Sequence, residues 1–143
     1  LERWVPWARE VQALEASRLY ARECEAGFIL GSLYDFNVFL PDNRLVCKVA
    51  AWPAAGGPEL LELGYWRRSG YAGLGYGREA VRGLMRWCLA QLGVGRFRIR
   101  CDEANAASRH LAEALGFSSV HVYEEDFYGV PRRKHLYERE VLR

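Results

Sequence analysis

Four glycines stand within eight residues in the segment GYAGLGYG, residues 70–77. An apolar run that predicts a strand precedes it, and a helical pattern of apolar residues follows it. Glycine permits positive φ and removes the side chain that would keep a ligand from the main-chain amides. The first amides of a helix are free and carry partial positive charge, which suits a diphosphate. The segment therefore predicts an anion-binding turn, with a merely flexible turn as the alternative.

Two common phosphate-binding patterns do not fit this segment. A Rossmann fingerprint requires G-x-G-x-x-G and an acidic residue ~20 positions later, whereas here Gly73, Gly75 and Gly77 alternate and no acid stands at that distance. A P-loop requires Lys and then Ser or Thr after its last glycine. This chain has Tyr76 and Gly77 there, so the turn belongs to another class.

The elements that must position this turn alternate between helical and strand patterns. In chain order we expect one or two helices within residues 7–26 with Gly27 as the stop, strands at SLYDFNVFL, LVCKVAAW and LLELGYWRR, a helix from the glycine segment to Gly93, a strand at RFRIRC, a helix at NAASRHLAEALGF, and strands near 118–123 and 134–142 joined by EEDFYGVPRR. This order predicts a mixed α/β fold with a mainly antiparallel central sheet flanked by helices.

Length and composition limit the class of protein. At 143 residues, half of them hydrophobic, the chain fits a single domain, and its net charge of +2 gives no strong pull toward nucleic acid or a membrane. No apolar run approaches the ~18 residues of a membrane span, and the start of the chain lacks a signal-peptide core. We therefore expect a cytosolic protein. Its four widely spaced cysteines predict small buried residues rather than a metal site or disulfides.

The segments ELGYWRRSGYAGLGYGREAVRGLM and LGVGRFRIRCDEANAASRHLAEALGF together resemble the GNAT superfamily of N-acetyltransferases, and within it the branch of the ribosomal-protein N-terminal acetyltransferases (RimJ/RimL-like). The resemblance is specific because three pieces occur in order: GYW on a strand, the glycine turn, and N-x-x-S opening a helix that closes in LGF. It covers most of the chain from Leu45 onward, and more loosely from Trp4. It implies the fold of that superfamily and acetyl-CoA as co-substrate.

The resemblance also implies that the backbone amides of a Q/R-x-x-G-x-G/A turn hold the pyrophosphate of acetyl-CoA. In this chain the implied binding residues are Ala72, Gly73, Leu74, Gly75, Tyr76, Gly77 and Arg78. Gly75 and Gly77 match the two small positions, but Ala72 stands where the pattern has Gln or Arg. Because amides bind most of the phosphate in such a turn, we expect this departure to weaken binding without abolishing it.

In the same fold a bulge in the strand before the turn separates it from its neighbour and admits the pantetheine arm. Gly64 is the implied place for that bulge in this sequence. Asn105 is implied to bond the pantetheine and Ser108 to lie near the sulfur. The further residues implied to offer backbone groups to the arm are Tyr65, Trp66 and Arg67.

Acetyl transfer to an amine requires a neutral amine, donors for the oxyanion and a proton source for the thiolate. Glu62 lies on the strand that should hold the thioester, so it is the candidate base, acting through water; a solvated carboxylate is the alternative. Ser108 is the candidate proton donor, with Tyr123 and Tyr137 as rivals, although a serine near a helix start is often a cap.

The amine acceptor has no readable motif. The branch resemblance favours a peptide or ribosomal-protein α-amine, and small-molecule amines stay open. Two other functions stay open: an acyl-CoA-binding sensor or scaffold without turnover, and a nucleic-acid-associated module suggested by the basic residues of RFRIR and residues 132–134. The near balance of acidic and basic residues disfavours the nucleic-acid module. We expect these basic residues to form a solvated face, or to contact the cofactor phosphate or an acidic acceptor.

The start of the chain raises a separate expectation. Members of the superfamily usually begin with a strand and a short helix, and no such pattern is found before Trp4. We therefore expect a domain that is incomplete at its N-terminus, and greater stability for a form extended upstream. The oligomeric state stays open, with a homodimer as one candidate, because dimers are common in the branch that the chain resembles.

Overall fold

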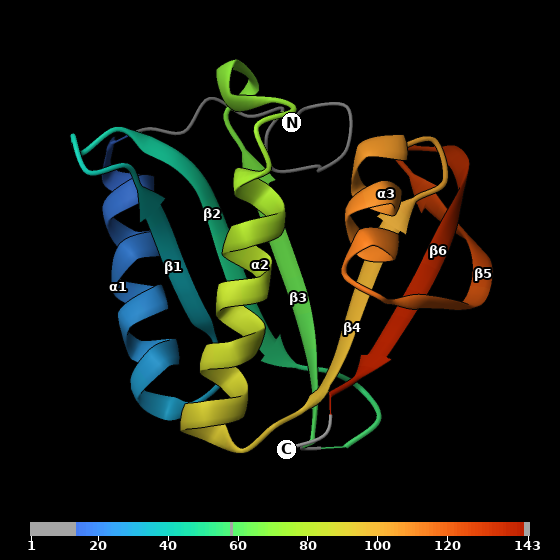
Figure 1. Ribbon diagram of the computed structural model, residues 1–143, viewed down its shortest axis with the longest axis horizontal. Helices are drawn as coiled ribbons and strands as arrows, with labels where there is room; N and C mark the ends of the chain where they lie inside the picture. Colours follow the sequence, from blue (N-terminus) through green and yellow to red (C-terminus); the bar gives the residue numbers. More distant parts are fainter. Residues whose placement is uncertain (1–13, 58, 142–143) are drawn as a thin grey trace.

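A computed structural model describes residues 14–57 and 59–141 of the chain. Its helices and strands are α1 (Leu14–Leu30), β1 (Tyr34–Phe39), β2 (Leu45–Pro53), β3 (Leu60–Arg67), the 3-10 turn η2 (Ser69–Tyr71), α2 (Tyr76–Trp87), the π-helical turn η3 (Cys88–Leu92), β4 (Arg96–Asp102), α3 (Ala106–Ala114), β5 (Ser118–Phe127) and β6 (Val130–Glu140) (Figure 1). The order expected from the sequence is confirmed. None of the described helices is long and apolar enough to cross a membrane.

The six strands form one sheet in the order β1-β2-β3-β4-β6-β5, and only the β3–β4 pair is parallel. The predicted mixed α/β class with a mainly antiparallel sheet is confirmed. β3 and β4 pair over three positions, the last being Glu62 opposite Arg98, although β3 continues to Arg67 and β4 to Asp102. Beyond that pair the two strands diverge and leave a V-shaped opening, which Figure 1 shows between them.

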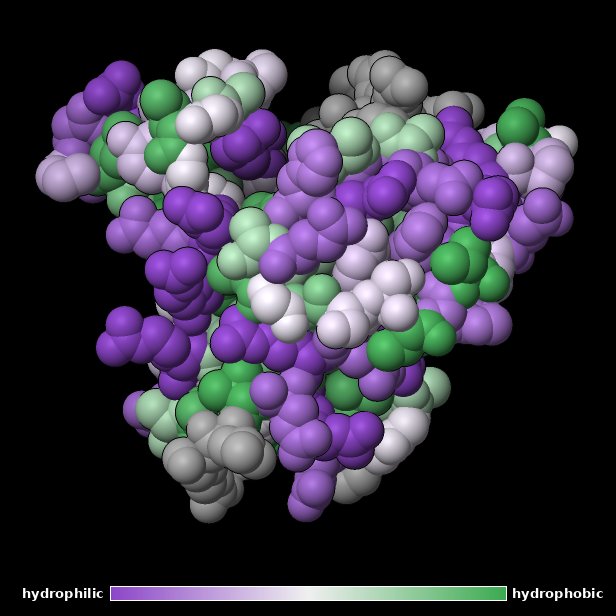
Figure 2. Space-filling view, turned by 45° about the vertical axis from the view of Figure 1, so that its right-hand side comes forward, coloured by the Kyte–Doolittle hydropathy of each residue, from purple (hydrophilic) through white to green (hydrophobic). Residues whose placement is uncertain are grey.

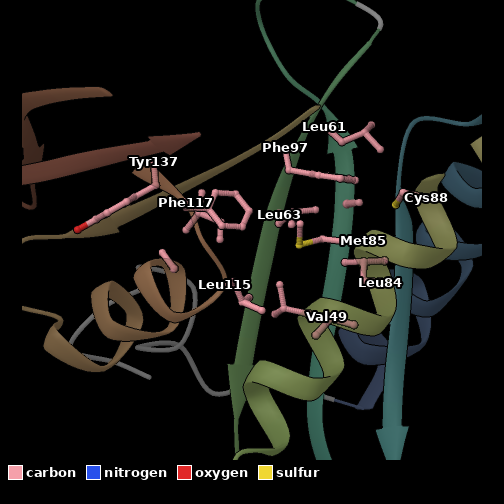
Figure 3. Close-up of a cluster of buried hydrophobic side chains, with 14 of the residues drawn as sticks. Val49, Leu61, Leu63, Leu84, Met85, Cys88, Phe97, Leu115, Phe117 and Tyr137 are labelled. Atoms are coloured by element: carbon pink, nitrogen blue, oxygen red, sulfur yellow. The ribbon is translucent and has the colours of Figure 1, made fainter. Parts of the chain in front are cut away.

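A hydrophobic core joins α2 and α3 to one face of this sheet. Val81, Leu84 and Met85 on α2 and Cys88 at the start of η3 recur at helical spacing and are all buried. Figure 3 shows Leu84, Met85 and Cys88 in this cluster. Alternate strand residues, such as Phe97 on β4, meet them from the sheet. Because side chains alternate across a strand, the intervening residues point to the opposite face. That face carries the polar side chains of Glu62, Arg98 and Arg100.

Gly27 does not stop the first helix, contrary to the sequence prediction. α1 continues to Leu30, and Gly31 follows it with φ of 72°. Gly27 is buried, and a Cβ there would lie 2.9 Å from the Cβ of Leu33, so this glycine allows a close chain approach instead. The part of the expected helix before residue 14 lies outside the described residues.

Gly64 is not a bulge, which is a second correction. It pairs in regular register with Ala50 on β2, and the separation of β3 from β4 begins without any irregularity on the β2 side. A Cβ at Gly64 would lie 2.7 Å from the indole ring of Trp52. The missing side chain therefore makes room for that ring on the face opposite the helices.

The segment EEDFYGVPRR is not a loop between two short strands. β5 and β6 run through it and form a hairpin whose turn is Tyr128–Gly129, both with positive φ. Asp126 accepts a hydrogen bond from the Gly129 amide at 2.9 Å. An aspartate and a glycine around a two-residue turn are a hairpin signal, but the charged flanking residues obscured the strand pattern.

Gly95 fixes the closed end of the V, and its replacement is expected to destabilise the fold. Its carbonyl accepts a hydrogen bond from the Val141 amide at 2.7 Å, and a Cβ would overlap the Val141 carbonyl oxygen. We expect Gly95→Ala to lower the free energy of unfolding by about 1–3 kcal/mol, as overpacking does. The matched variant Gly83→Ala, in open space within α2, should raise it by about 0.5–1 kcal/mol. Urea unfolding measures both, and equal effects would contradict the argument.

Candidate active site

The glycine turn presents a row of free amides at the start of α2. Gly73 and Gly75 have φ of 77° and 80°, and a Cβ on either would meet no atom within 4 Å. The first amide in this region with a backbone acceptor is that of Glu79, which donates to Gly75 at 3.0 Å. Among the described residues, the amides of residues 73–78 have no hydrogen-bond acceptor. This is the donor set that an anion requires.

The side chain at the end of β3 adds to this excess of donors. The Nε of Arg67 is buried and has no partner among the described residues. A buried guanidinium N–H without an acceptor is costly, so the local chemistry fits a phosphorylated ligand. Figure 1 places the turn at the end of the molecule toward which the V between β3 and β4 opens. We therefore take the turn and the diverging ends of β3 and β4 together as the candidate binding site.

Tyr65 and Ser108 meet across the opening. Tyr65 is on β3 and Ser108 is in the first turn of α3, and their hydroxyl oxygens are 2.7 Å apart. The Tyr65 hydroxyl also donates to the Ser108 carbonyl at 3.3 Å. Burial raises the pKa of Tyr65 well above its usual range, so the phenol keeps its proton at neutral pH. The opening is therefore lined by a hydroxyl pair on the helix side of the sheet.

Asn105 is the N-cap of α3. Its side-chain oxygen accepts a hydrogen bond from the backbone amide of Ser108 at 3.2 Å. The backbone amide of Asn105 donates to the backbone carbonyl of Asp102 at 2.9 Å. The cap uses only the oxygen of the side chain. The Asn105 NH₂ group has no partner among the described residues, so it is available for the pantetheine contact that the resemblance implies.

Glu62 and Tyr123 lie in a second part of the site, on the face opposite the helices. They line a cleft of about 210 Å³ together with Arg98, Arg100 and two apolar neighbours. Glu62 is at the vertex of the V and is only 7% exposed. Arg100 Nε donates to Glu62 Oε1 at 2.7 Å, and this hydrogen bond raises the pKa of Arg100 above its usual value. Glu62 is thus held by a permanently charged neighbour.

The sequence-predicted site residues therefore fall into three groups around one opening. The amides of residues 72–78 are at its mouth, the pair formed by Tyr65 and Ser108 is on the helix side, and Glu62 with Tyr123 is on the other side. Trp66 lies on the same face of the sheet as Glu62, because side chains alternate along β3 and the two residues are an even number of positions apart in a regular register. Tyr137 is not in the site: its ring is in the core, 2% exposed, and its hydroxyl donates to Glu113.

Sequence reasoning missed Arg100 as a site residue. The alternation in RFRIR predicted a basic face, but not which carboxylates it would meet. Most of that charge is neutralised within the sheet: Arg98 pairs with Glu138, Arg132 with Asp102, Arg133 with Glu103 and Lys134 with Glu125. Such pairing leaves little net charge for a phosphate backbone, which argues against nucleic-acid binding.

Three of the four cysteines behave as expected. Cys47, Cys88 and Cys101 are buried and free. Cys24 differs, because it is half-buried and its thiol donates to Asp35 at 3.0 Å. The reason is that α1 packs against the edge strand β1 at this point, so only part of the thiol is covered.

A splayed β3–β4 pair beside a turn of free amides defines the class of acyl-CoA-dependent N-acyltransferases, the class that the sequence resembles. The family model described as "Acetyltransferase (GNAT) domain" matches residues 1–118, most of the chain. The chain therefore belongs to the GNAT acetyltransferase family. It is an acetyl-CoA-dependent N-acetyltransferase, as the resemblance implied. The comparison with curated protein sequences gave no match.

Solved structures share this fold. The chain is similar to RimL, a ribosomal L7/L12 α-N-protein acetyltransferase in complex with coenzyme A, with TM-score 0.88 and 19% identity over 96% of this chain and 78% of that one. It is similar to MccE, a microcin C7 self-immunity acetyltransferase in complex with acetyl-CoA and AMP, with TM-score 0.87 and 18% identity over 97% and 78%. A ribosomal-protein-S5-alanine acetyltransferase from Vibrio fischeri gives TM-score 0.79 and 19% identity over 88% and 71%.

Proposed function

We propose that this protein transfers the acetyl group of acetyl-CoA to an α-amine of a peptide or protein, with Glu62 as the base. The observation that carries the proposal is the position of Glu62. Its carboxylate stands at the vertex of the β3–β4 opening and borders a cleft on the face opposite the hydroxyl pair. An amine can therefore approach from one face while the thioester is held from the other.

Acetyl-CoA supplies an activated acetyl group when bound: the C–S bond breaks as the N–C bond forms, and the proton lost by the amine is balanced by one gained at sulfur. The amides of residues 73–78 would hold its pyrophosphate and Arg67 would add a charged donor. The NH₂ group of Asn105 and the unpaired edges of β3 and β4 would hold the arm. Backbone donors at the vertex suit the acetyl oxygen.

Glu62 would take the proton from the incoming ammonium, directly or through water. An α-amine with a pKa near ~8 is already partly neutral at physiological pH, whereas a lysine amine near ~10.4 is mostly charged. A single carboxylate base therefore suits an α-amine, which needs less deprotonation, better than a lysine side chain.

Ser108 would return a proton to the thiolate, with Tyr65 as its hydrogen-bond donor. The buried Tyr65 phenol keeps its one hydrogen and can donate it to Ser108 Oγ at 2.7 Å in place of the Ser108 carbonyl at 3.3 Å. The serine's own hydrogen is then free to point into the opening. Tyr123, on the Glu62 face, is the rival proton donor, because it borders the same cleft.

The choice of a peptide or ribosomal-protein α-amine is supported by the activities of the similar solved proteins, two of which act on ribosomal proteins. MccE, whose structure holds AMP as well as acetyl-CoA, keeps a small-molecule amine as the alternative. A single domain and a cytoplasmic location stay predictions from the sequence, and a homodimer is the candidate for the oligomeric state. Light scattering of the purified protein tests the last of these.

An acceptor panel tests the proposed function. We expect thiol release from acetyl-CoA with short peptides that have a free N-terminus, and at least about 10-fold less with the same peptides blocked at the N-terminus but carrying an internal lysine, because the lysine amine is mostly protonated at pH 7.5. Equal rates with both peptide sets would overturn the α-amine assignment. Binding of coenzyme A without turnover of any amine would favour a sensor.

A further inference from the structure

The cleft beside Glu62 is lined by two arginines that differ in how many of their nitrogens donate to protein oxygens. Arg98 donates through Nε and Nη2 to Glu138 and through Nη1 to the Ala55 carbonyl, at 2.6–2.9 Å. Its side chain is 19% exposed. Arg98 therefore ties the loop before β3 to the sheet, and its Nε and both of its terminal nitrogens already donate to protein oxygens.

Arg100, two residues later on the same face of β4, is different. Among the described residues, its one hydrogen bond to a carboxylate runs from Nε to Glu62, and its side chain is 47% exposed. A hydrogen bond with the Tyr123 side chain raises the arginine pKa further, after the larger effect of Glu62. The terminal Nη groups thus border an open cleft, beside a phenol that can share an anion.

The charges of the cleft favour a particular kind of acceptor. A lone ammonium that approaches Glu62 meets a carboxylate already neutralised by Arg100, so the attraction is weakened. An acceptor that also brings a carboxylate to the Arg100 Nη groups restores the balance, with the ammonium on Glu62 and the anion on the guanidinium. At about 210 Å³ the cleft is smaller than the ~300–1,000 Å³ of drug-sized ligand sites, so it suits the end of an acceptor.

We propose that Arg100 selects acceptors that carry a carboxylate close to the reacting amine. The inference rests on the proposed function and names its substrate class. The carboxylate can come from a free amino acid, where it shares a carbon with the amine, or from an acidic residue at the start of a peptide. Arg100 is then a specificity-determining residue, and Tyr123 forms the wall beside it.

Matched pairs of acceptors that differ only in this charge test the inference. Serine is compared with serinamide, and the amidated peptide Ser-Asp-Ala with Ser-Asn-Ala, by kcat/KM at saturating acetyl-CoA. In the unmodified protein we expect the acidic member of at least one pair to be preferred by about 10- to 100-fold, the range that a hydrogen bond to a charged group provides. A preference within the serine pair alone assigns the amino-acid carboxylate, and one within the peptide pair alone assigns the side chain.

The variants separate anion recognition from support of Glu62. Arg100→Gln should bring the preference close to 1, and Arg100→Lys should retain part of it. Loss of support for Glu62 slows both members of a pair equally and leaves their ratio unchanged. The matched control is Arg96→Gln, which removes one positive charge from the same face of β4, outside the cleft, and should keep the full ratio.

Two results would overturn the inference: no preference for the acidic member of either pair in the unmodified protein, or an undiminished preference in Arg100→Gln. If Arg100→Gln does not fold, the inference is tested by two measurements: the ratio of kcat/KM within each pair in the unmodified protein, and the same ratio in Arg100→Lys. Absence of acetylation with every amine would instead overturn the proposed function, and the inference with it.

Discussion

Gly75→Val is expected to weaken coenzyme A binding by about 100-fold or more. Gly75 precedes α2 with φ of 80°, a conformation that a β-branched residue does not tolerate. The backbone would leave the left-handed region and turn neighbouring amides away from a common point. Hydrogen bonds to charged groups contribute about 1.5–3 kcal/mol each, so losing two costs about 3 kcal/mol or more, which corresponds to that factor.

Isothermal titration with coenzyme A measures this effect directly. Gly70→Ala is the matched control: Gly70 belongs to the same segment, lacks positive φ, and a Cβ there would meet nothing within 4 Å. We expect its affinity to stay within about 2-fold, because its amide is not part of the row at residues 73–78. Similar affinities for the two variants would show that the turn does not hold the diphosphate.

Glu62→Gln is expected to lower kcat by about 10²- to 10⁴-fold, the usual contribution of a general base. Glutamine preserves the shape of the side chain and an oxygen acceptor for Arg100 Nε, now 2.7 Å from the carboxylate. The affinity for coenzyme A should stay unchanged, because Glu62 lies on the face opposite the Tyr65–Ser108 pair. Turnover of a peptide acceptor at pH 7 measures the loss.

The pH dependence distinguishes a base from a structural carboxylate. An α-amine with a pKa near ~8 is mostly protonated at pH 7 and mostly neutral at pH 9. If Glu62 removes that proton, the deficit of Glu62→Gln shrinks as the pH rises, because the amine no longer needs the base. A deficit that is the same at pH 7 and pH 9 would assign Glu62 a structural role.

The face in Figure 2, which brings the β5–β6 side of Figure 1 forward, is mostly hydrophilic, and hydrophobic residues interrupt it in small groups. The exposed hydrophobic residues of β5, β6 and their turn are Val120, Val122, Tyr128 and Val130. β5 is an edge strand, and the charges of Glu124, Glu125 and Asp126 along it guard against pairing with another chain.

Local signals predicted most of the elements. Each of these signals depends on residues only a few positions apart, so a short segment is enough to predict it. Examples are the apolar stripe on α2, the cap at Asn105 and the glycines at 73 and 75. Reliance on neighbouring residues also explains two errors. By their local sequence Gly27 is predicted to stop a helix and Gly64 to form a bulge. In the structure, each glycine instead makes room for another side chain, Leu33 beside Gly27 and Trp52 beside Gly64.

The sequence by itself determined the order of helices and strands, the position of the glycine turn and the family, because helical periodicity, strand alternation and glycine conformation are properties of short segments. Only the tertiary structure decided where β3 leaves β4, that Tyr65 meets Ser108 43 residues away, and that Glu62 meets Arg100 38 residues away. Those contacts depend on the register of strands distant in sequence, and register is fixed by packing of the whole core.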